Sequence, residues 1–313
     1  MLLSILILIE MKISIIGSGQ VGERIGKTFA KKGHNVLFYD VKKEVLERLK
    51  NEGYKTTNNP KEVIDKTNIS FISVPTPIDE NGNYDYSYIK SVAETFGSFL
   101  KDVYHVFVLK STVTPGTTEN ILIRGLEESS GKKTDKDFGV VYNPEFLTVI
   151  EKTWTDDEGF RITPGNEGRI VIGLSEKALK DGNGVFKVIK ELYFSFGLDI
   201  LKTDYKTAEF TKLAANNRLS LAISYSNELF LFSQMLKEKG VNIDIDFVIK
   251  AVHMDHRIGP YGSVFGKAWG GPCFKKDTKA FERFFLDTTG ESPSLISNNI
   301  KINEKMKEFG IRE

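Results

Sequence analysis

Short runs rich in Val, Ile and Phe alternate with helical patterns from Lys12 to about Thr203. The runs are continuously apolar, which is typical of strands buried on both faces. Since amphipathic helical patterns separate them, the alternation predicts a parallel sheet covered by helices on both sides, that is, a doubly wound α/β domain. The predicted strands are ISII at 13–16, NVLFYD at 35–40, ISFISV at 69–74, VFVLKS at 106–111, FGVVYN at 138–143 and RIVIG at 169–173.

The pattern changes after Asp204, where apolar residues recur at helical spacing for more than thirty residues, up to Gly240. Part of this helix, SLAISYSNELFLF, is apolar nearly all round, which indicates a helix enclosed between domains or between subunits. A chain of 313 residues is long enough for two domains. The expected division is an N-terminal extension at 1–10, the α/β domain at 11–204, a mostly α-helical second domain at 205–297, and the start of a connecting helix at 298–313.

The first predicted strand runs directly into a glycine-rich turn, and a helical pattern follows to Gly33. In such a turn the first glycine permits a tight bend, the second lets the backbone approach a pyrophosphate, and the third lets helix pack on strand. An acid at the end of the next strand can bind the adenosine ribose hydroxyls and would repel a 2′-phosphate. These features predict a Rossmann-type site for NAD rather than NADP, formed by Gly17, Gly19, Gln20, Val21, Gly22 and Asp40. A tight turn without a ligand is the alternative.

Two further segments follow predicted strands, VPTP at 74–77 and KSTVTPGTT at 110–118. In open α/β sheets, ligands bind at the carboxyl edge of the strands. We therefore assign Val74, Pro75, Thr76, Ser111 and Thr112 to the cofactor site. Ordinary turns between strand and helix would explain both segments equally well.

The single cysteine, Cys273, stands in WGGPCFKKDT, just ahead of a helical pattern. A helix N-terminus and the adjacent Lys275 and Lys276 both favour a nucleophilic thiolate over the thiol. One cysteine allows no internal disulfide and is typical of a reducing compartment, so we expect the cytoplasm. The 43 basic residues nearly cancel the 42 acidic ones, which argues against nucleic acid or a membrane surface as partner. The apolar opening MLLSILILIE is too short to span a bilayer.

An NAD site together with a nucleophilic thiol favours a specific reaction sequence. Hydride removal from an alcohol gives an aldehyde, which a thiolate captures; a second hydride transfer gives a thioester, and water releases the acid. Such a site needs an oxyanion partner and carboxylates that manage protons. Lys212 and Asn216, spaced four residues apart on one helix face, are candidates, as are Glu145 and Asp277; each alone would pass for an ordinary polar residue.

Taken in order, the motifs GSGQVG, VPTP, STVTPGTT, NPEFL, RIVIG, KLAANN, DHRIG and GGPCFKKDT resemble those of the UDP-glucose/GDP-mannose dehydrogenase family. The resemblance runs from Met11 to the end, and GGPCFKKDT with NPEFL and the Lys212/Asn216 pair is its most specific part. It implies oxidation of the C6 hydroxyl of a nucleotide sugar to a carboxylate, in two NAD-dependent steps, through a cysteine-bound intermediate. UDP-glucose is the favoured substrate, with GDP-mannose or a UDP-hexosamine as variants.

The resemblance also implies roles for individual residues. Cys273 would be the nucleophile, and Asp277 would help to activate the thiol or the water. Lys212 and Asn216 would hold the C6 oxygen and stabilise the oxyanion. Further roles fall to Thr112 beside the nicotinamide, Glu145 in thioester hydrolysis, Lys276 at the cofactor, Arg257 at a neighbouring subunit's sugar site, and Phe146, Leu147, Phe265 and Gly270 in the sugar pocket.

Three features depart from the family pattern. Thr148-Val149-Ile150 stands where relatives usually have Arg-Glu-Gly, and Arg218 stands where they often have an aromatic or aliphatic residue. The sequence also ends at Glu313, where relatives continue into a third, Rossmann-like domain that helps to bind the nucleotide. A homodimer through the long helix is expected, and a separate chain that supplies the third domain stays open.

Two alternatives remain at this stage. A catalytically degenerate NAD-binding subunit could serve as scaffold for a full-length relative. A single-step dehydrogenase of the 6-phosphogluconate or 3-hydroxyacid type would share the α/β-then-helical layout but would lack a catalytic cysteine. No metal site is expected.

Overall fold

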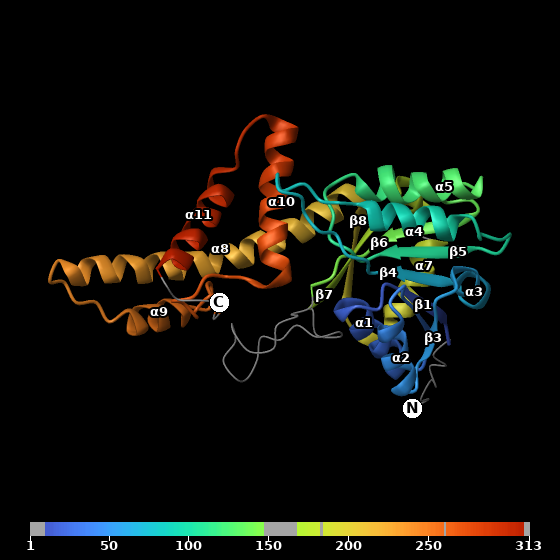
Figure 1. Ribbon diagram of the computed structural model, residues 1–313, viewed down its shortest axis with the longest axis horizontal. Coiled ribbons are helices and arrows are strands. Elements are labelled where there is room, and N and C mark those ends of the chain that lie inside the picture. Colours follow the sequence, from blue (N-terminus) through green and yellow to red (C-terminus); the bar gives the residue numbers. More distant parts are fainter. Residues whose placement is uncertain (1–9, 147–167, 182–183, 260, 310–313) are drawn as a thin grey trace, which may run out of the picture. The chain divides into compact units, whose positions relative to one another are not determined.

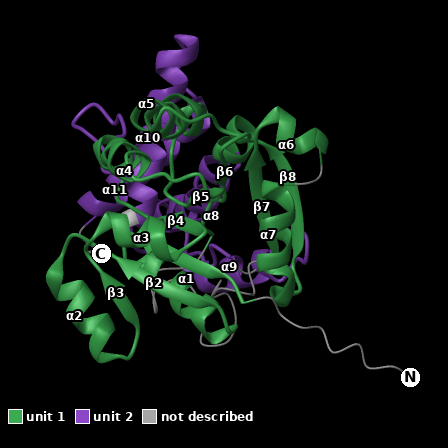
Figure 2. Ribbon diagram, turned by 90° about the vertical axis from the view of Figure 1, so that its right-hand side faces the viewer, with its two compact units in different colours: residues 1–76, 85–149, 162–210 green, residues 77–84, 150–161, 211–313 purple. Residues whose placement is uncertain are grey.

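The computed structural model describes residues 10–146, 168–181, 184–259 and 261–309 (Figure 1). It divides into two compact units, coloured in Figure 2. Unit 1 comprises residues 1–76, 85–149 and 162–210, and unit 2 comprises 77–84, 150–161 and 211–313. The short segment 77–84 therefore belongs to unit 2, although unit 1 residues flank it on both sides.

Unit 1 is built on an eight-stranded sheet with the order β3-β2-β1-β4-β5-β6-β7-β8. Each of the predicted strands is present, and the doubly wound Rossmann-type fold is confirmed. Two strands, β3 and β8, were not predicted. The strands are β1 (Lys12–Ile16), β2 (Asn35–Tyr39), β3 (Lys55–Thr57), β4 (Ile69–Ile72), β5 (His105–Leu109), β6 (Phe138–Tyr142), β7 (Arg169–Leu174) and β8 (Asp199–Asp204).

The predicted parallel sheet contains one antiparallel pair. β6 pairs with β7 in the antiparallel direction, with Tyr142 opposite Gly173, whereas the other neighbouring strands pair in parallel. The six parallel strands β3-β2-β1-β4-β5-β6, which include those that carry the predicted cofactor motifs, are unaffected.

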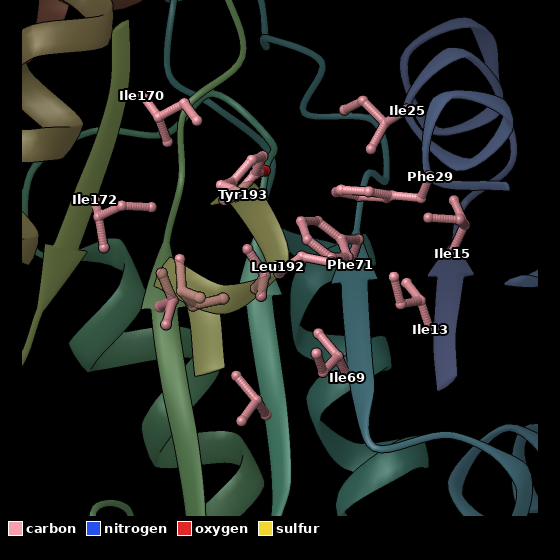
Figure 3. Close-up of a cluster of buried hydrophobic side chains, with 14 of the residues drawn as sticks. Ile13, Ile15, Ile25, Phe29, Ile69, Phe71, Ile170, Ile172, Leu192 and Tyr193 are labelled. Atoms are coloured by element: carbon pink, nitrogen blue, oxygen red, sulfur yellow. The ribbon is translucent and has the colours of Figure 1, made fainter. Parts of the chain in front are cut away.

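Helices cover both faces of this sheet. Successive strand residues point to opposite sides, so each face has its own buried cluster. Ile15 of β1 lies in one buried cluster and Ile16 in another. Figure 3 shows the first cluster, in which Phe29 packs against Phe71 with ring centroids 5.0 Å apart. The helical elements of unit 1 are α1 (Gln20–Lys31), α2 (Lys43–Asn51), α3 (Pro60–Lys66), α4 (Ser87–Gly97), η1 (Thr118–Ile123), α5 (Arg124–Ser130), α6 (Glu176–Asp181), α7 (Val185–Tyr193) and η2 (Phe194–Phe196).

A buried polar chain crosses the middle of the sheet. The hydroxyls of Ser14 and Ser70 are 2.6 Å apart, and the Ser70 hydroxyl lies 2.8 Å from Nε2 of His105. Burial lowers the pKa of His105 to about 4. The imidazole is therefore neutral in the folded protein at physiological pH.

Unit 2 is helical, as predicted. The long helix α8 (Tyr205–Glu238) starts in unit 1 and continues into unit 2, which also contains α9 (Ile245–His253), α10 (Gly271–Thr289) and α11 (Ser294–Glu308). Trp269 is held at the start of α10, because its backbone N–H donates to Oδ1 of Asn303 at 2.7 Å and its indole N–H to the Ser224 hydroxyl at 2.7 Å. Helices α8 and α11 thus fix the entry to the helix that carries Cys273. No helix within the described ranges has the length and apolar character that a membrane span requires.

Candidate active site

The glycine turn, residues 17–22, joins β1 to α1 in the way the motif predicts. Gly17 has φ +88°, and a Cβ there would lie 2.8 Å from the Ser73 carbonyl oxygen. A Cβ on Gly22 would lie 2.1 Å from the Gly17 carbonyl oxygen, so this position tolerates no side chain. A Cβ on Gly19 would meet nothing within 4 Å, so space is open where a pyrophosphate would approach the backbone.

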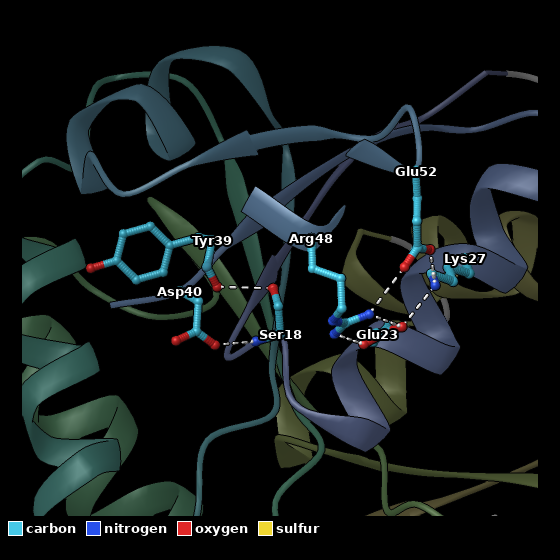
Figure 4. A network of polar contacts seen from close by, with 7 residues as sticks. All are labelled: Ser18, Glu23, Lys27, Tyr39, Asp40, Arg48 and Glu52. Carbon is cyan, nitrogen blue, oxygen red and sulfur yellow. Dashed lines mark hydrogen bonds and ion pairs between the residues drawn. The ribbon is translucent and has the colours of Figure 1, made fainter. Parts of the chain in front are cut away.

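The carboxylate of Asp40, at the end of β2, is fixed by main-chain donors. Its Oδ2 accepts from the Ser18 N–H at 2.8 Å (Figure 4). Its Oδ1 accepts from the Lys42 N–H at 2.9 Å. The acid is therefore locked beside the glycine turn, in the position where a dinucleotide-binding site needs an acceptor for ribose hydroxyls. Gln20 and Val21 are the first two residues of α1; the former is exposed and the latter half-buried.

An ion-pair network fastens α1 to α2 beside this turn (Figure 4). Arg48 binds both carboxylate oxygens of Glu23, and Lys27 binds Glu23 and Glu52. The hydrogen bond from Arg48 is the main cause that lowers the pKa of Glu23 to about 2. The network supports the first turn of α1, to which the phosphates of a dinucleotide would be directed.

The ends of β4 and β5 are tied together by two side-chain bonds. The Ser111 hydroxyl donates to the Val74 carbonyl at 2.6 Å, and the Thr76 hydroxyl donates to the Thr112 carbonyl at 2.9 Å. Pro75 between them is exposed. β1 lies between β2 and β4, so the order of the strands reverses between β1 and β4. These residues and the glycine turn lie at this topological switch point, where ligands bind in such sheets.

The Glu145 cluster, formed by Lys110, Asn143, Glu145 and Tyr193, lies at the ends of β5 and β6. Lys110 Nζ is 3.2 Å from Glu145 Oε2 and donates to Asn143 Oδ1 at 3.0 Å. The same Oδ1 accepts from the Tyr193 hydroxyl at 2.6 Å. Lys110 and Glu145 are 6% and 8% exposed, so this is a buried ion pair. Phe146 follows, with the Arg169 guanidinium 4.6 Å from its ring centroid, whereas Leu147 lies outside the described residues.

A second buried acid, Glu209 on α8, holds the segment that follows Thr112. Its carboxylate accepts from the backbone N–H groups of Gly116 and Thr118 at 2.5 and 2.8 Å, and from the Thr118 hydroxyl at 2.6 Å. These bonds satisfy main-chain donors at the start of η1. Burial raises the pKa of Glu209 to about 7, although the three donors oppose this effect.

The thiol cluster, formed by Lys212, Asn216, Cys273, Lys276 and Asp277, lies in unit 2. Lys212 Nζ donates to Asn216 Oδ1 at 3.1 Å, and Asn216 Nδ2 donates to Asp277 Oδ2 at 2.6 Å. Lys276 Nζ donates to Asp277 Oδ1 at 2.5 Å. Asp277 is fully buried, and Cys273 precedes it by one turn of α10, so the two project from the same face of the helix.

The expected direction of the thiol pKa was wrong. Cys273 is the third residue of α10, as the sequence predicts, but burial raises the pKa of its thiol and the Asp277 carboxylate raises it further. Lys212 and Lys276 act in the opposite direction without outweighing these effects. The thiol form is therefore favoured in the protein without substrate.

The remaining candidates are distributed over unit 2. Gly270 is the N-cap residue of α10, and Phe265 packs against Phe230 of α8 with ring centroids 5.6 Å apart. The Arg257 guanidinium is exposed and forms an ion pair with Asp255 at 2.5 Å. The candidates thus form two sets, each described within its own unit: the cofactor turn, Thr112 and Glu145 in unit 1, and the thiol cluster in unit 2.

The sequence interpretation missed five residues of these sites: Lys110, Asn143, Tyr193, Glu209 and Tyr84, whose hydroxyl donates to Asp277. Lys110 could have been found as a lysine at the end of a predicted strand. Glu209 could have been found as an acid in the first turns of the long helix. Nothing local in the sequence marks Tyr84.

A dinucleotide turn at the switch point of a doubly wound sheet, followed by a helical unit, defines an NAD-dependent dehydrogenase of the Rossmann type. Family models identify the branch: residues 43–197 match the NAD binding domain, and residues 206–305 the central domain, of the UDP-glucose/GDP-mannose dehydrogenase family. The chain belongs to this family of NAD-dependent nucleotide-sugar dehydrogenases.

Individual relatives agree with the family assignment. The chain is 32% identical to the UDP-glucose 6-dehydrogenase AglM of Haloferax volcanii, with 95% of this chain and 70% of that protein covered. It is 30% identical to the UDP-glucose 6-dehydrogenase TuaD of Bacillus subtilis, with 95% and 63% covered, and 31% identical to the GDP-mannose 6-dehydrogenase of Pseudomonas aeruginosa, with 96% and 70% covered. The chain thus spans about two thirds of the length of these relatives.

Solved structures give the same result. A UDP-glucose dehydrogenase from Pyrobaculum islandicum superimposes with a TM-score of 0.82 at 29% identity, over 96% of this chain and 69% of that one. The 3-hydroxyisobutyrate dehydrogenase of Mycobacterium tuberculosis shares the fold at a TM-score of 0.64 and 13% identity, over 96% and 94% of the two chains. The same fold therefore occurs in nucleotide-sugar dehydrogenases and in a hydroxyacid dehydrogenase, so only the residues of the site can distinguish one chemistry from the other.

Proposed function

We propose that this protein oxidises the C6 hydroxyl of a nucleotide sugar to a carboxylate, in two hydride transfers and through a covalent bond to Cys273. UDP-glucose is the proposed substrate, because two of the relatives described above are named for it. The observation that carries the proposal is the thiol cluster, in which Lys212, Asn216 and Asp277 are linked by hydrogen bonds. An ordinary single-step dehydrogenase has no use for a thiol in this setting.

NAD, when bound, accepts a hydride in each oxidation. The open space at Gly19 and the fixed Asp40 carboxylate fit the pyrophosphate and the adenosine ribose. Ser111 and Thr112, at the end of β5, are the proposed contacts of the nicotinamide end. Lys276 is also proposed to reach the cofactor, although here its ammonium group binds Asp277.

The residues of the thiol cluster have distinct proposed tasks. Lys212 and Asn216 hold the C6 oxygen, and their N–H groups stabilise the negative charge that develops on it. When the thiolate of Cys273 adds to the C6 aldehyde, a carbon–sulfur bond forms and the carbonyl π electrons move to that oxygen. Loss of hydride from C6 then gives a thioester, and water displaces the sulfur to give the carboxylate.

Proton transfers in this sequence need bases close to the reacting atoms. Because burial raises the pKa of Cys273, a neighbouring base or cation must help to form the thiolate. Lys212 and Lys276 favour the thiolate, whereas Asp277 disfavours it, so Asp277 is the proposed base for the water. Glu145 is proposed to assist thioester hydrolysis, and Lys110 would hold its carboxylate in place. Phe146, Leu147, Phe265 and Gly270 are the proposed lining of the sugar pocket.

A homodimer through α8 is part of the proposal. Tyr225, Phe232 and Met235 project from this helix and are each more than half exposed. Exposed aromatic and Met side chains on one helix are typical of an interface. Arg257 would then contribute to the sugar site of the second subunit, and we place the protein in the cytoplasm.

The test is the stoichiometry of oxidation by the purified protein. With UDP-glucose we expect two NAD reduced per sugar, and a covalent sugar adduct on Cys273 in the mass spectrum of a stalled reaction. One NAD per sugar, with an unaffected Cys273→Ala variant, would identify a single-step dehydrogenase. NAD binding without turnover of any nucleotide sugar would favour the scaffold.

A further inference from the structure

A phenol from a distant part of the sequence reaches the thiol cluster. The Tyr84 hydroxyl donates to Asp277 Oδ1 at 2.5 Å, across 193 residues of sequence. Tyr84 is 9% exposed and Asp277 is fully buried, so both partners of this bond are buried. Lys276 Nζ, which binds the same oxygen, lies 5.0 Å from the centroid of the Tyr84 ring.

The loop that carries Tyr84, residues 77–84, is closed on itself. Ile78 and Tyr84 form an antiparallel bridge, and the Asp79 N–H donates to the Asn83 carbonyl at 2.8 Å. The Asp79 carboxylate accepts from the backbone N–H groups of Asn81 and Asn83 and from the Asn83 amide. These bonds stabilise the conformation of the Tyr84 loop.

The Tyr84 loop also lies directly against α10. Gly82 has φ +88°, and a Cβ there would be 3.3 Å from the Lys279 carbonyl oxygen and 3.5 Å from Arg283 Cβ. Such close approach places the loop in van der Waals contact with the helix. The Tyr84 hydroxyl is therefore positioned at Asp277 by a loop that is hydrogen-bonded within itself and packed against α10.

We propose that Tyr84 is a positioning residue of the oxidation, whose hydroxyl orients the Asp277 carboxylate, withdraws part of its negative charge and so keeps the Cys273 thiol reactive. The inference rests on the proposed function in one respect, namely that Cys273 is the nucleophile. The residue itself touches neither substrate nor cofactor in this proposal; it acts through Asp277.

The sign of the effect follows from the groups around the thiol. Asp277 disfavours the thiolate, whereas Lys212 and Lys276 favour it. Asp277 in turn is faced by three donors: Tyr84, Asn216 and Lys276. If the Tyr84 hydroxyl is removed, the carboxylate projects more of its negative charge toward the sulfur, and the pKa of Cys273 rises further.

The test is the pH profile of alkylation by iodoacetamide, measured on the full chain without sugar or cofactor. Cys273 is the single cysteine of the sequence, so the signal has one source. Because only the thiolate reacts, we expect Tyr84→Phe to slow alkylation at pH 8 about threefold, as its profile moves about half a unit toward higher pH. The rate well above the midpoint should stay unchanged, which a merely structural defect would not produce.

Three further variants test whether Tyr84 affects the Cys273 thiol through Asp277. Asp277→Asn should accelerate alkylation, and Tyr84→Phe should add nothing in that background. Tyr86→Phe is the matched control, because the Tyr86 hydroxyl bonds Thr114 at 2.7 Å instead of Asp277; its profile should equal that of the wild type. Asn83→Ala loosens the loop without touching the phenol and should give a smaller shift in the same direction.

An unshifted profile in folded Tyr84→Phe overturns the proposal, as does the same slowing in the Asp277→Asn background. If Tyr84→Phe does not fold, Asn83→Ala decides: a shift toward higher pH supports the proposal, and an unshifted profile overturns it. A protein that shows the Tyr84 effect but never reduces two NAD per sugar would refute the proposed function, while the effect of Tyr84 on the reactivity of the Cys273 thiol would stand.

Discussion

The glycine turn of unit 1 and the thiol cluster of unit 2 place their functional groups by different means. The glycine turn uses main-chain atoms: Gly17 and Gly22 fit where no side chain fits, and Asp40 is held by two backbone N–H groups. The thiol cluster uses side chains from α8, α10 and the Tyr84 loop, which bond to one another. A site of the first kind is specified by a short stretch of sequence, whereas one of the second kind depends on distant segments.

The largest expected effect comes from removing the sulfur. Cys273→Ala should lower complete oxidation of the nucleotide sugar at least about 1000-fold, because the aldehyde can no longer be held as a covalent adduct. NAD affinity, measured by titration of the protein fluorescence, should be unchanged, since the dinucleotide turn lies in unit 1. A variant that still forms the acid at the wild-type rate would contradict the role of the thiol cluster.

The glycine turn can be broken in two distinguishable ways. Gly22→Ala forces a Cβ to within 2.1 Å of the Gly17 carbonyl, so we expect a destabilisation of several kcal/mol and loss of NAD binding. Gly19→Ala adds a methyl group in open space and should leave the melting temperature within about 2 °C of the wild type. The Gly19 variant should nevertheless bind NAD more weakly, because the methyl group occupies the space of the pyrophosphate. Equal melting temperatures for both variants would refute this distinction.

The Glu145 cluster combines features of both sites, because it lies at strand ends in unit 1 but is held together by side chains. Removing its cation tests this side-chain pairing. Lys110→Met takes away one partner of a buried ion pair and should cost about 3 kcal/mol of stability in urea unfolding. The double variant Lys110→Met with Glu145→Gln should recover much of that stability but should oxidise the sugar no better than Glu145→Gln alone. Additive losses of stability in the double variant would show that the two side chains do not interact.

The pH dependence of stability should show the buried imidazole. Between pH 6.5 and about 4 the unfolded chain binds a proton at His105 that the folded protein excludes. Stability from this residue is thus complete above pH 6.5 and falls by about 3 kcal/mol as the pH drops through this window. His105→Gln should lack this fall. When the free energy of unfolding is measured against pH for both proteins, the difference between wild type and variant should therefore change by that amount across the window. Glu209, whose pKa is raised to about 7 and which acts in the opposite direction, is present in both proteins and cancels.

The sequence predicts the parts of this molecule that depend on local pattern. The apolar strands, the glycine turn, the long helix and the position of Cys273 at the start of α10 all follow from residues close together in the chain. β3 and β8 were missed because KTT is short and DILKTD is largely polar, as edge strands of a sheet can be. The direction of the Cys273 pKa was wrong because burial, the largest cause, is a property of the folded protein.

The partners of the acids could not be predicted for a similar reason. Lys110 reaches Glu145, and Tyr84 reaches Asp277, through contacts between segments that are far apart in sequence. A single sequence contains no signal that pairs them. The resemblance to relatives names the acids but does not name these partners.

The path of the chain has a consequence for taking the molecule apart. Residues 77–84 belong to the helical unit, yet they lie in sequence between two strands of the sheet, and α8 also passes from one unit to the other near residue 210. A fragment cut at the boundary near residue 210 would keep the Tyr84 loop and lose the helix on which it rests. Dissection of this protein into a cofactor-binding piece and a thiol-bearing piece therefore requires moving at least residues 77–84 to the second piece, as well as choosing a cleavage point.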